Sequence, residues 1–357
     1  MSDTYQVIGL MSGTSLDGVD IAYCRFSIEN KEWSFTIEKA ESIPYDREWK
    51  QRLIGVMEGN AVDYVKTHAE LGRHFGELLK DFISKNNCRP LLIASHGHTI
   101  FHQPLMGYTA QIGDGSQIAA ITGIDTICDF RSKDVALNGQ GAPLVPAGEV
   151  KLFKEFPFCL NLGGIANITV SKNHRLVAFD ICPANMALNF LSNKKGADYD
   201  KDGLMAQKGK VIQPLLEKLN QLNYYQLPYP KSLGKEWFDT NMKPLLNEPG
   251  IIVEDVMATV CRHVAVQIKS AIKEFLPGSK DRLLITGGGA FHPLLIKFIQ
   301  EETAMEIVIP EKMVIEFKEA MVFAFLGLLF YRDEKNVLKA VTGATIDHIS
   351  GALYKGG

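Results

Sequence analysis

The order of hydrophobic and polar positions predicts a meander of three strands at the start of the chain. The segments "YQVIGLM", "VDIAYCRFSI" and "EWSFTIEKAESI" are rich in β-branched and aromatic residues, and turn residues separate them. Hydrophobic residues at helical spacing then predict helices over 47–58 and 61–85. Further strands are predicted at "PLLIASHG", "TIFHQP", "TAQIGDG" and "DTICDF", with a short helix at "SQIAAITG". A meander followed by alternating helices and strands is typical of a mixed-sheet α/β domain.

The same order of elements begins again after a turn-rich segment at 137–148, "LNGQGAPLVPAG", which we interpret as a domain boundary. "FPFCLNLGGIANITVSKNHRLVAFDI" predicts a second meander, and a helix follows over 254–275. "RLLITGGGA" predicts a strand that ends in a glycine turn, and "HPLLIKFIQEE" predicts the next helix. The sequence therefore predicts two lobes of one plan, 1–137 with 316–357, and 138–315. The segment "EAMVFAFLGLLF" would be the helix that returns the chain to the first lobe.

Composition narrows the class of protein. A chain of 357 residues, 46% hydrophobic and 22% charged, is expected to form about two globular domains. A formal net charge of -3 argues against nucleic-acid binding. The longest apolar segment, at 320–331, is shorter than the ~20 residues of a membrane span, so we expect no membrane contact. The six cysteines form no CxxC pair and no secretory signal is recognisable, which predicts reduced thiols in a cytoplasmic protein.

Three predicted strands end in glycine-rich turns, at 12–18 ("SGTSLDG"), 161–167 ("NLGGIAN") and 286–293 ("TGGGAFHP"). Glycine allows positive φ and close approach of a ligand, and successive backbone N–H groups in such a turn bind phosphate oxygens. A single turn of this kind is equally consistent with a plain hairpin, whereas three together favour phosphate binding. The sequence contains no GxxxxGK[ST], and no GxGxxG opens a helix behind a strand, which argues against P-loop and dinucleotide-binding folds.

The twofold plan with paired glycine hairpins resembles the superfamily of sugar kinases, acetate kinases, heat-shock ATPases and actin. Within that superfamily the chain is similar to the 1,6-anhydro-N-acetylmuramic acid kinase family, in blocks that run from residue 9 to about residue 344. The blocks are "GLMSGTSLDGVD", "ASHGHTIFHQP", "QIGDG", "DFRSKDVALNGQGAPLVP", "LNLGGIANIT", "FDICPANMALN", "YDKDG", "PKSLGKEWF", "ITGGGAFHP", "KEAMVFAF" and "VTGA". The resemblance implies two ribonuclease H-like lobes with mixed sheets flanked by helices and an ATP cleft between them.

The resemblance implies that the first glycine turn binds the phosphates of ATP. Asp17 or Asp20 would hold Mg²⁺ through water, although Met11 stands where the wider superfamily often has an Asp. A second phosphate hairpin and a loop on the adenosine side are implied as well. The residues of the first turn are Gly13, Thr14, Ser15, Leu16, Asp17, Gly18, Val19 and Asp20; those of the second are Gly163, Gly164 and Asn167; those of the adenosine loop are Gly287, Gly288 and Gly289.

The reaction that the resemblance implies joins phosphoryl transfer to hydrolysis. ATP phosphorylates O6 of 1,6-anhydro-N-acetylmuramic acid while water opens the anhydro bridge at C1, which gives N-acetylmuramate 6-phosphate for the recycling of cell-wall sugar. The resemblance assigns the base that activates water to Asp180, at the end of "LVAFD". A base of this kind contributes ~10²–10⁴-fold to a rate. The alternative is that Asp180 caps the helix that follows at "PANMALNF".

The resemblance also points to Arg131 and Glu319 as groups that bind the sugar. Arg131 suits the lactyl carboxylate through paired hydrogen bonds, with Asp129 orienting it. Glu319 suits the sugar hydroxyls or amide. An ion pair at a domain interface is the alternative interpretation for Arg131 and Glu319.

Three histidines in "SHGHTIFH" allow two interpretations. His96, His98 and His102 would share one face of a strand, so a metal site is conceivable, but no carboxylate or cysteine lies in the same stretch. The family uses this segment near its sugar site, so we expect His96 and His98 to line the substrate cleft. His98 stands where the family usually has Gln.

The chain also departs from the family beside the proposed base. It reads "FDICPANM" where the family commonly has "FDTGPGN", so that Ile181, Cys182 and Ala184 replace Thr and two glycines. A small residue standing in for Gly is a better interpretation of Cys182 than a nucleophile, because no Cys/His arrangement is visible. Lys231 and Lys235 in "PKSLGKEW" either approach a phosphate or are solvated, and the sequence leaves this open.

The favoured partners are therefore two small molecules, ATP and a sugar, and the resemblance also allows a homodimer. One rival function is a kinase of the same fold that acts on another sugar, in which Asp180 would deprotonate a hydroxyl group. The other is an ATP-dependent binding protein of the actin or heat-shock type. The chain lacks the extra peptide-binding domain of heat-shock ATPases, and the fold alone does not decide, because it hosts many functions.

Overall fold

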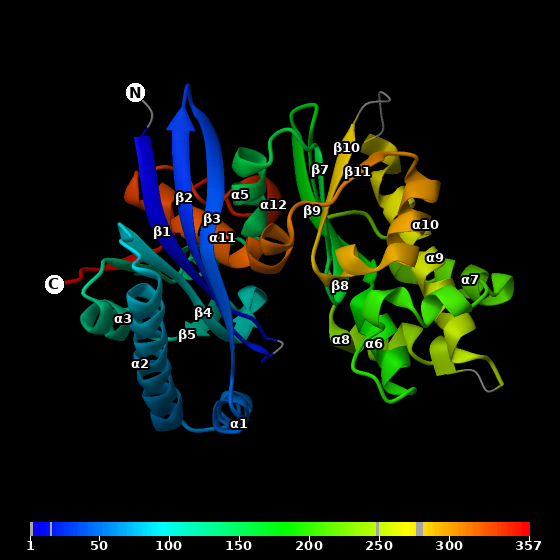
Figure 1. The fold of residues 1–357 in the computed structure, drawn as a ribbon, viewed down its shortest axis with the longest axis horizontal. Helices are drawn as coiled ribbons and strands as arrows, with labels where there is room; N and C mark the ends of the chain where they lie inside the picture. Colours follow the sequence, from blue (N-terminus) through cyan, green and yellow to red (C-terminus); the bar gives the residue numbers. More distant parts are fainter. Residues whose placement is uncertain (1–2, 15, 248–249, 276–280) are drawn as a thin grey trace. The chain divides into compact units, whose positions relative to one another are not determined.

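The computed structural model describes residues 3–14, 16–247, 250–275 and 281–357. The chain forms two compact units, Met1–Phe153 with Phe317–Gly357, and Lys154–Glu316 (Figure 1). The first unit extends beyond residue 137, where the sequence places the boundary, because helix α5 (Val145–Leu152) packs on strand β3 (Glu32–Pro44). The chain returns to the first unit within helix α11 (Lys312–Tyr331), at Phe317, whose φ of -114° and ψ of 15° are not helical.

The first unit is built on a seven-stranded mixed sheet in the order β12-β6-β4-β1-β2-β3, with β5 paired to β4. Strands β1 (Asp3–Ser12), β2 (Gly18–Glu29) and β3 form the antiparallel meander that the sequence predicts. Strand β4 (Leu92–Gln103) lies parallel to β1 and joins two segments that the sequence predicts as separate strands. The remaining strands are β5 (Tyr108–Ile112), β6 (Thr126–Cys128) and β12 (Ala352–Tyr354).

Helices cover both faces of this sheet. Ile8 and Leu10 of β1 belong to a hydrophobic cluster that includes Leu71 of α2 (Ala61–Asn86). Gly9, between them, faces α11 so closely that a Cβ atom there would lie 1.8 Å from the carbonyl oxygen of Ala320. The other helices of this unit are α1 (Arg47–Gly55), α3 (Gly115–Thr122), α4 (Ser132–Ala136) and α12 (Lys339–Thr342).

The second unit repeats the plan on a five-stranded sheet in the order β11-β10-β7-β8-β9. Strands β7 (Phe158–Leu162), β8 (Ile165–Lys172) and β9 (Arg175–Pro183) form an antiparallel meander. Strand β10 (Arg282–Thr286) lies parallel to β7, as β4 lies parallel to β1, and β11 (Glu306–Val308) lies parallel to β10. Two mixed α/β units on one plan are the fold that the sequence predicts.

Helices and strands of the second unit pack together in a large hydrophobic cluster. Val260, Val264 and Ile268 of α9 (Val253–Ile272) are fully buried in it. The remaining helices are α6 (Asn185–Asn193), α7 (Gln213–Asn220), α8 (Lys235–Trp237) and α10 (Pro293–Thr303). In the described ranges no helix combines the length and the apolar character that a membrane crossing requires. All six cysteines are free thiols.

Candidate active site

The first glycine turn connects β1 to β2. Strand β1 ends at Ser12 and β2 begins at Gly18, and between them Leu16 adopts a φ of 60° and donates its N–H to the Gly13 carbonyl at 3.3 Å. Thr14 and Asp17 are exposed on the turn. Ser15 lies outside the described residues. The turn thus presents backbone groups and an acidic side chain to solvent.

Two further residues of this segment lie on β2 rather than in the turn. The side chain of Val19 is buried in the core of the unit, and Val19 pairs in register with Ser12 of β1 and Ile43 of β3. Asp20 is half-buried and accepts a hydrogen bond from the Ser42 hydroxyl. Its charge contributes to raising the pKa of Glu319 on α11. Mg²⁺ characteristically takes one or two carboxylates together with water and phosphate oxygens, so the Asp20 carboxylate is of the kind that could hold this ion.

Tyr45 supports the first glycine turn at both of its ends. Its hydroxyl lies 2.7 Å from the Ser12 hydroxyl, and its backbone N–H donates to the Asp17 carbonyl at 3.2 Å. Ser12 in turn lies 2.9 Å from Nδ1 of His98. Burial lowers the pKa of His98 to about 4, so this ring is neutral at neutral pH. His98 therefore contacts Ser12, the residue of β1 that leads into the first glycine turn.

Arg131 is held by a neutral histidine and a carbonyl group. Its Nε and Nη2 atoms donate to Nε2 of His96 at 3.0 and 2.8 Å, and Nη1 donates to the Gly141 carbonyl at 2.6 Å. Because Arg only donates, Nε2 of His96 accepts, and Nδ1–H donates to the Gly97 carbonyl at 2.9 Å. Burial and the Arg131 charge keep the pKa of His96 well below its usual range. These bonds leave one N–H on each terminal nitrogen of Arg131 for a further acceptor.

Asp129 does not take the position that the sequence suggests for it. The sequence suggests that it orients Arg131, but Asp129 adopts a φ of 56° and accepts the backbone N–H of Ser132 at 3.2 Å, at the start of α4. His96 and Gly141 orient Arg131 instead.

Glu319 on α11 remains in contact with solvent. The protein atoms around its carboxylate nevertheless desolvate it, and this raises the pKa of Glu319, while the Lys318 and Arg131 charges oppose the increase. Arg131 and Glu319 thus influence each other electrostatically within one unit. Lys318 itself forms a buried ion pair with Glu149 at 2.8 Å, which ties α11 to α5.

The three histidines of β4 do not share one face of the strand. Gly97 has a φ of 74°, and the pairing of β4 with β1 is irregular at this point. His96 packs on Phe323 of α11 with 4.5 Å between the ring centroids, whereas His98 contacts Tyr45, which belongs to the cluster on the α2 face. Among the described residues, no three or more His, Cys, Asp or Glu side chains come together in a group that could hold a metal ion. The prediction that the three histidines share one face of a regular strand is therefore wrong.

The second and third glycine turns lie directly against each other in the second unit. Gly163 and Gly164 connect β7 to β8, and their carbonyls accept N–H groups from the start of α6, including that of Asn185 at 3.1 Å. Gly287 has a φ of 81°, and a Cβ atom there would lie 2.6 Å from the side-chain oxygen of Asn161. Gly164 and Gly288 are exposed. Asn167, at the start of β8, pairs in register with Asp180 of β9.

The block "YDKDG" supports the third glycine turn. His292 lies in that turn and caps α10, where its Nδ1 accepts the Leu295 N–H at 3.3 Å. Its Nε2 atom lies 3.4 Å from the carboxylate of the buried Asp200. This contact joins two blocks of the sequence that are far apart along the chain.

Asp180 is half-buried on β9, and a neighbouring loop holds its carboxylate. Oδ2 accepts the Leu233 N–H at 2.9 Å, the backbone N–H donates to the Lys231 carbonyl at 3.1 Å, and the carbonyl accepts the Tyr224 hydroxyl at 2.7 Å. Burial raises the pKa of Asp180, and the Leu233 N–H opposes this. Asp180 does not cap α6, because Ala184 occupies the cap position and no side chain caps that helix.

The residues beside Asp180 are packed rather than reactive. Ile181, Cys182 and Ala184 are buried in the core of the second unit. Burial raises the pKa of the Cys182 thiol, so it stays protonated, consistent with a small packing residue. Of the two lysines that the sequence leaves open, Lys231 donates to the Tyr224 carbonyl at 3.2 Å, and Lys235 pairs with Asp239.

The structure agrees with the fold that the sequence predicts, two mixed α/β units on one plan with glycine turns beside their meanders. The comparison with protein families then gives the class of protein. The chain belongs to the anhydro-N-acetylmuramic acid kinase family, whose model matches residues 5–356. The resemblance seen in the sequence is therefore confirmed, and the chain is a kinase of this family.

Individual relatives match along their whole length. An anhydro-N-acetylmuramic acid kinase from Vibrio cholerae is 36% identical, with 99% of both chains covered. One from Saccharophagus degradans is 36% identical, with 97% of this chain and 98% of the relative covered. Among solved structures, the activator of the 2-hydroxyisocaproyl-CoA dehydratase from Clostridium difficile with bound ADPNP gives a TM-score of 0.44 at 14% identity, over 89% of this chain and 92% of that one.

Proposed function

We propose that this chain converts 1,6-anhydro-N-acetylmuramic acid, ATP and water into N-acetylmuramate 6-phosphate and ADP, in the recycling of cell-wall sugar. Membership of the family supports the substrate and the phosphoryl transfer. The proposal that water opens the anhydro bridge rests on one observation. The Asp180 carboxylate on β9 is half-buried, and the backbone N–H of Leu233 fixes it. Six free cysteines suit the reducing environment of the cytoplasm.

Asp180 acts in this proposal as the general base. The Leu233 N–H binds Oδ2 and so fixes the orientation of the carboxylate, which leaves Oδ1 for a water molecule. Burial raises the pKa of Asp180 and therefore its basicity, which favours proton transfer from that water. The water oxygen then bonds to C1, the bond between C1 and O6 breaks, and O6 takes the γ-phosphoryl group as ADP leaves.

The first unit supplies the groups that bind the sugar. Arg131 keeps an N–H on each terminal nitrogen, which suits paired hydrogen bonds to the lactyl carboxylate. Glu319 accepts from the sugar hydroxyls or amide in this proposal. His96 holds Arg131 from behind, so it acts on the sugar through the guanidinium.

The glycine turns supply the groups that bind the nucleotide. The backbone of the first turn and of Gly163 and Gly164 would bind the phosphates, with the Asn167 side chain beside them. Gly287 and its two neighbours would lie along the adenosine. Asp17 and Asp20 are the side chains that would hold Mg²⁺, which neutralises charge on the phosphates when bound.

The experiment combines the wild-type protein with Mg-ATP and the anhydro sugar in ¹⁸O-water, and mass spectrometry follows the sugar product. We expect a phosphosugar with one ¹⁸O at the anomeric carbon, after correction for anomeric exchange. An unlabelled phosphosugar would contradict hydrolytic opening. Phosphorylation of hexoses with the anhydro sugar untouched would indicate another sugar kinase, and ATP hydrolysis without any acceptor would indicate an actin-type protein.

Asp180→Asn is the matched variant for the role of the base. We expect turnover to fall ~10²–10⁴-fold, because the amide cannot accept the proton, while ATP binding stays near that of the wild type. Asp239→Asn in the same unit, which loses only surface ion pairs with Lys235 and Lys243, serves as the control. Turnover of Asp180→Asn close to that of the control would end the assignment of the base.

A further inference from the structure

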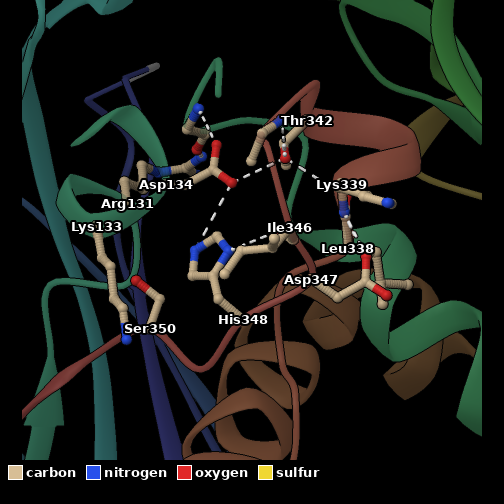
Figure 2. A network of polar contacts seen from close by, with 12 residues as sticks. Arg131, Lys133, Asp134, Leu338, Lys339, Thr342, Ile346, Asp347, His348 and Ser350 are labelled. Atoms are coloured by element: carbon tan, nitrogen blue, oxygen red, sulfur yellow. Dashed lines mark hydrogen bonds and ion pairs between the residues drawn. The ribbon is translucent and has the colours of Figure 1, made fainter. Parts of the chain in front are cut away.

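A fully buried carboxylate lies one helical turn from Arg131 and has no place in the proposed reaction. Asp134 on α4 is wholly inaccessible to solvent, so it cannot touch a substrate. Oδ2 accepts the Gly141 N–H at 2.7 Å, and Oδ1 accepts the Thr342 hydroxyl at 2.8 Å (Figure 2). Burying a carboxylate is costly in free energy unless hydrogen bonds compensate. These two bonds therefore explain why the Asp134 carboxylate can be buried inside the unit.

Gly141 connects this carboxylate to Arg131. Its N–H donates to Asp134 and its carbonyl accepts Nη1 of Arg131 at 2.6 Å, so the two charged groups bind the two polar groups of one residue. The loop before Gly141 wraps around the carboxylate as well. Gly139 donates its N–H to the Asp134 carbonyl at 2.8 Å, and a Cβ atom at Gly139 would lie 2.1 Å from Oδ2.

The second bond of Asp134 comes from the far end of the sequence. Thr342 lies at the end of α12, 208 residues beyond Asp134, and its carbonyl accepts the Gln140 N–H at 2.8 Å. The buried His348 also faces Asp134, with 3.7 Å between Nε2 and Oδ1 (Figure 2). Lys133, on the outer side of the same turn, donates to the Ile349 carbonyl at 2.7 Å. The segment 338–350 therefore closes over the loop 137–141.

We propose that Asp134 and Thr342 are positioning residues for Arg131. Together they fix the loop 137–141, so that the Gly141 carbonyl holds the guanidinium in the orientation that binds the carboxylate of the sugar. The inference rests on the proposed function of Arg131 and extends it, because it makes the C-terminal segment part of sugar recognition. Electrostatics support the arrangement, since burial lowers the pKa of Arg131 to about 10 and the Glu319 and Asp134 charges oppose this.

Thr342→Val tests the inference, because it removes one hydroxyl and keeps the shape of the side chain. We expect the KM for the anhydro sugar to rise about three- to tenfold, the range for one typical intramolecular hydrogen bond, with the KM for ATP unchanged. Thr342→Ser should restore the wild-type KM. Lys133→Met, which loses only the contact with Ile349, should leave both KM values unchanged.

A double-mutant cycle with Arg131→Ala separates positioning from a general structural role. Thr342→Val should have no further effect on sugar binding once Arg131 is absent, because nothing is left to position. Equal effects of Thr342→Val in both backgrounds, or a wild-type KM in the single variant, would overturn the inference while the role of Arg131 stands. Unchanged sugar binding in Arg131→Ala would overturn that role and the inference together.

Discussion

Burial and one hydrogen bond shift the pKa of Asp180 in opposite directions, and this gives a test that concerns a single residue. Burial raises its pKa, and the Leu233 N–H lowers it. A base works only when deprotonated, so kcat/KM should fall as the pH drops through a pKa above the ordinary value of 3.8. Leu233→Pro removes the N–H, and we expect it to move this acid limb to higher pH and to lower the plateau, because the same bond fixes the orientation of the carboxylate.

Leu233→Ala is the control for the proline variant, since it shortens the side chain and keeps the N–H. Its acid limb should coincide with that of the wild type. The measurement is kcat/KM for the anhydro sugar as a function of pH in all three proteins. An acid limb that does not move in Leu233→Pro would mean that this hydrogen bond does not set the basicity of Asp180.

The resemblance to the family points to Asp180 and Arg131 as candidates, but it does not point to the residues that hold them. Asp180 and Arg131 belong to recognisable blocks, and their charges suit a proton acceptor and a carboxylate ligand. Tyr45 and Leu233 act through contacts with segments distant along the chain, and Leu233 acts through its backbone, so no side-chain pattern marks them. The alternation of a regular strand predicts one face for His96 and His98, but Gly97, with its positive φ, breaks that alternation.

At the level of elements, the packing of β1 on α11 leaves no room for a side chain at Gly9. A Cβ atom there would lie 1.8 Å from the Ala320 carbonyl oxygen. We expect Gly9→Ala to lower the free energy of unfolding by roughly 3 kcal/mol or more, since backbone must move against backbone. Chemical denaturation followed by circular dichroism measures the change.

Gly55 offers the matched control for Gly9. It ends α1, and a Cβ atom there would meet nothing within 4 Å. Gly55→Ala should therefore leave the free energy of unfolding unchanged or raise it by up to about 1 kcal/mol. Equal stability of the two variants would show that β1 and α11 separate at little cost.

The two meanders and the long helices follow from the sequence because each carries many periodic positions. Strand β6 lies within "DTICDF", which the sequence predicts as a strand. Strand β12 has only three residues, too few for periodicity to identify, and it pairs with β6 although the two segments are far apart along the chain. For the same reason the sequence does not predict the contacts of α12, a helix of four residues that places Thr342 within hydrogen-bonding distance of Asp134. Local sequence patterns therefore do not predict the short elements that tertiary contacts hold in place.

At the level of the whole molecule, the proposed ligand groups are divided between the two units. Arg131 and Glu319 belong to the first unit, and Asp180 belongs to the second. A ligand that binds only the folded chain stabilises it by about 2.7 kcal/mol at a hundredfold excess over its Kd. Mg-ATP and the anhydro sugar should therefore each raise the Tm of the wild-type protein.

Substitutions should remove these stabilisations selectively. We expect Arg131→Ala to lose the increase in Tm caused by the sugar and to keep the increase caused by Mg-ATP, because its guanidinium is assigned to the lactyl carboxylate alone. Asp180→Asn should keep both increases, since the assigned role of Asp180 is proton transfer rather than binding. Differential scanning fluorimetry with each ligand separately measures this. Loss of the Mg-ATP effect in Arg131→Ala would contradict the assignment of Arg131 to the sugar, and loss of the sugar effect in Asp180→Asn would make Asp180 a binding group.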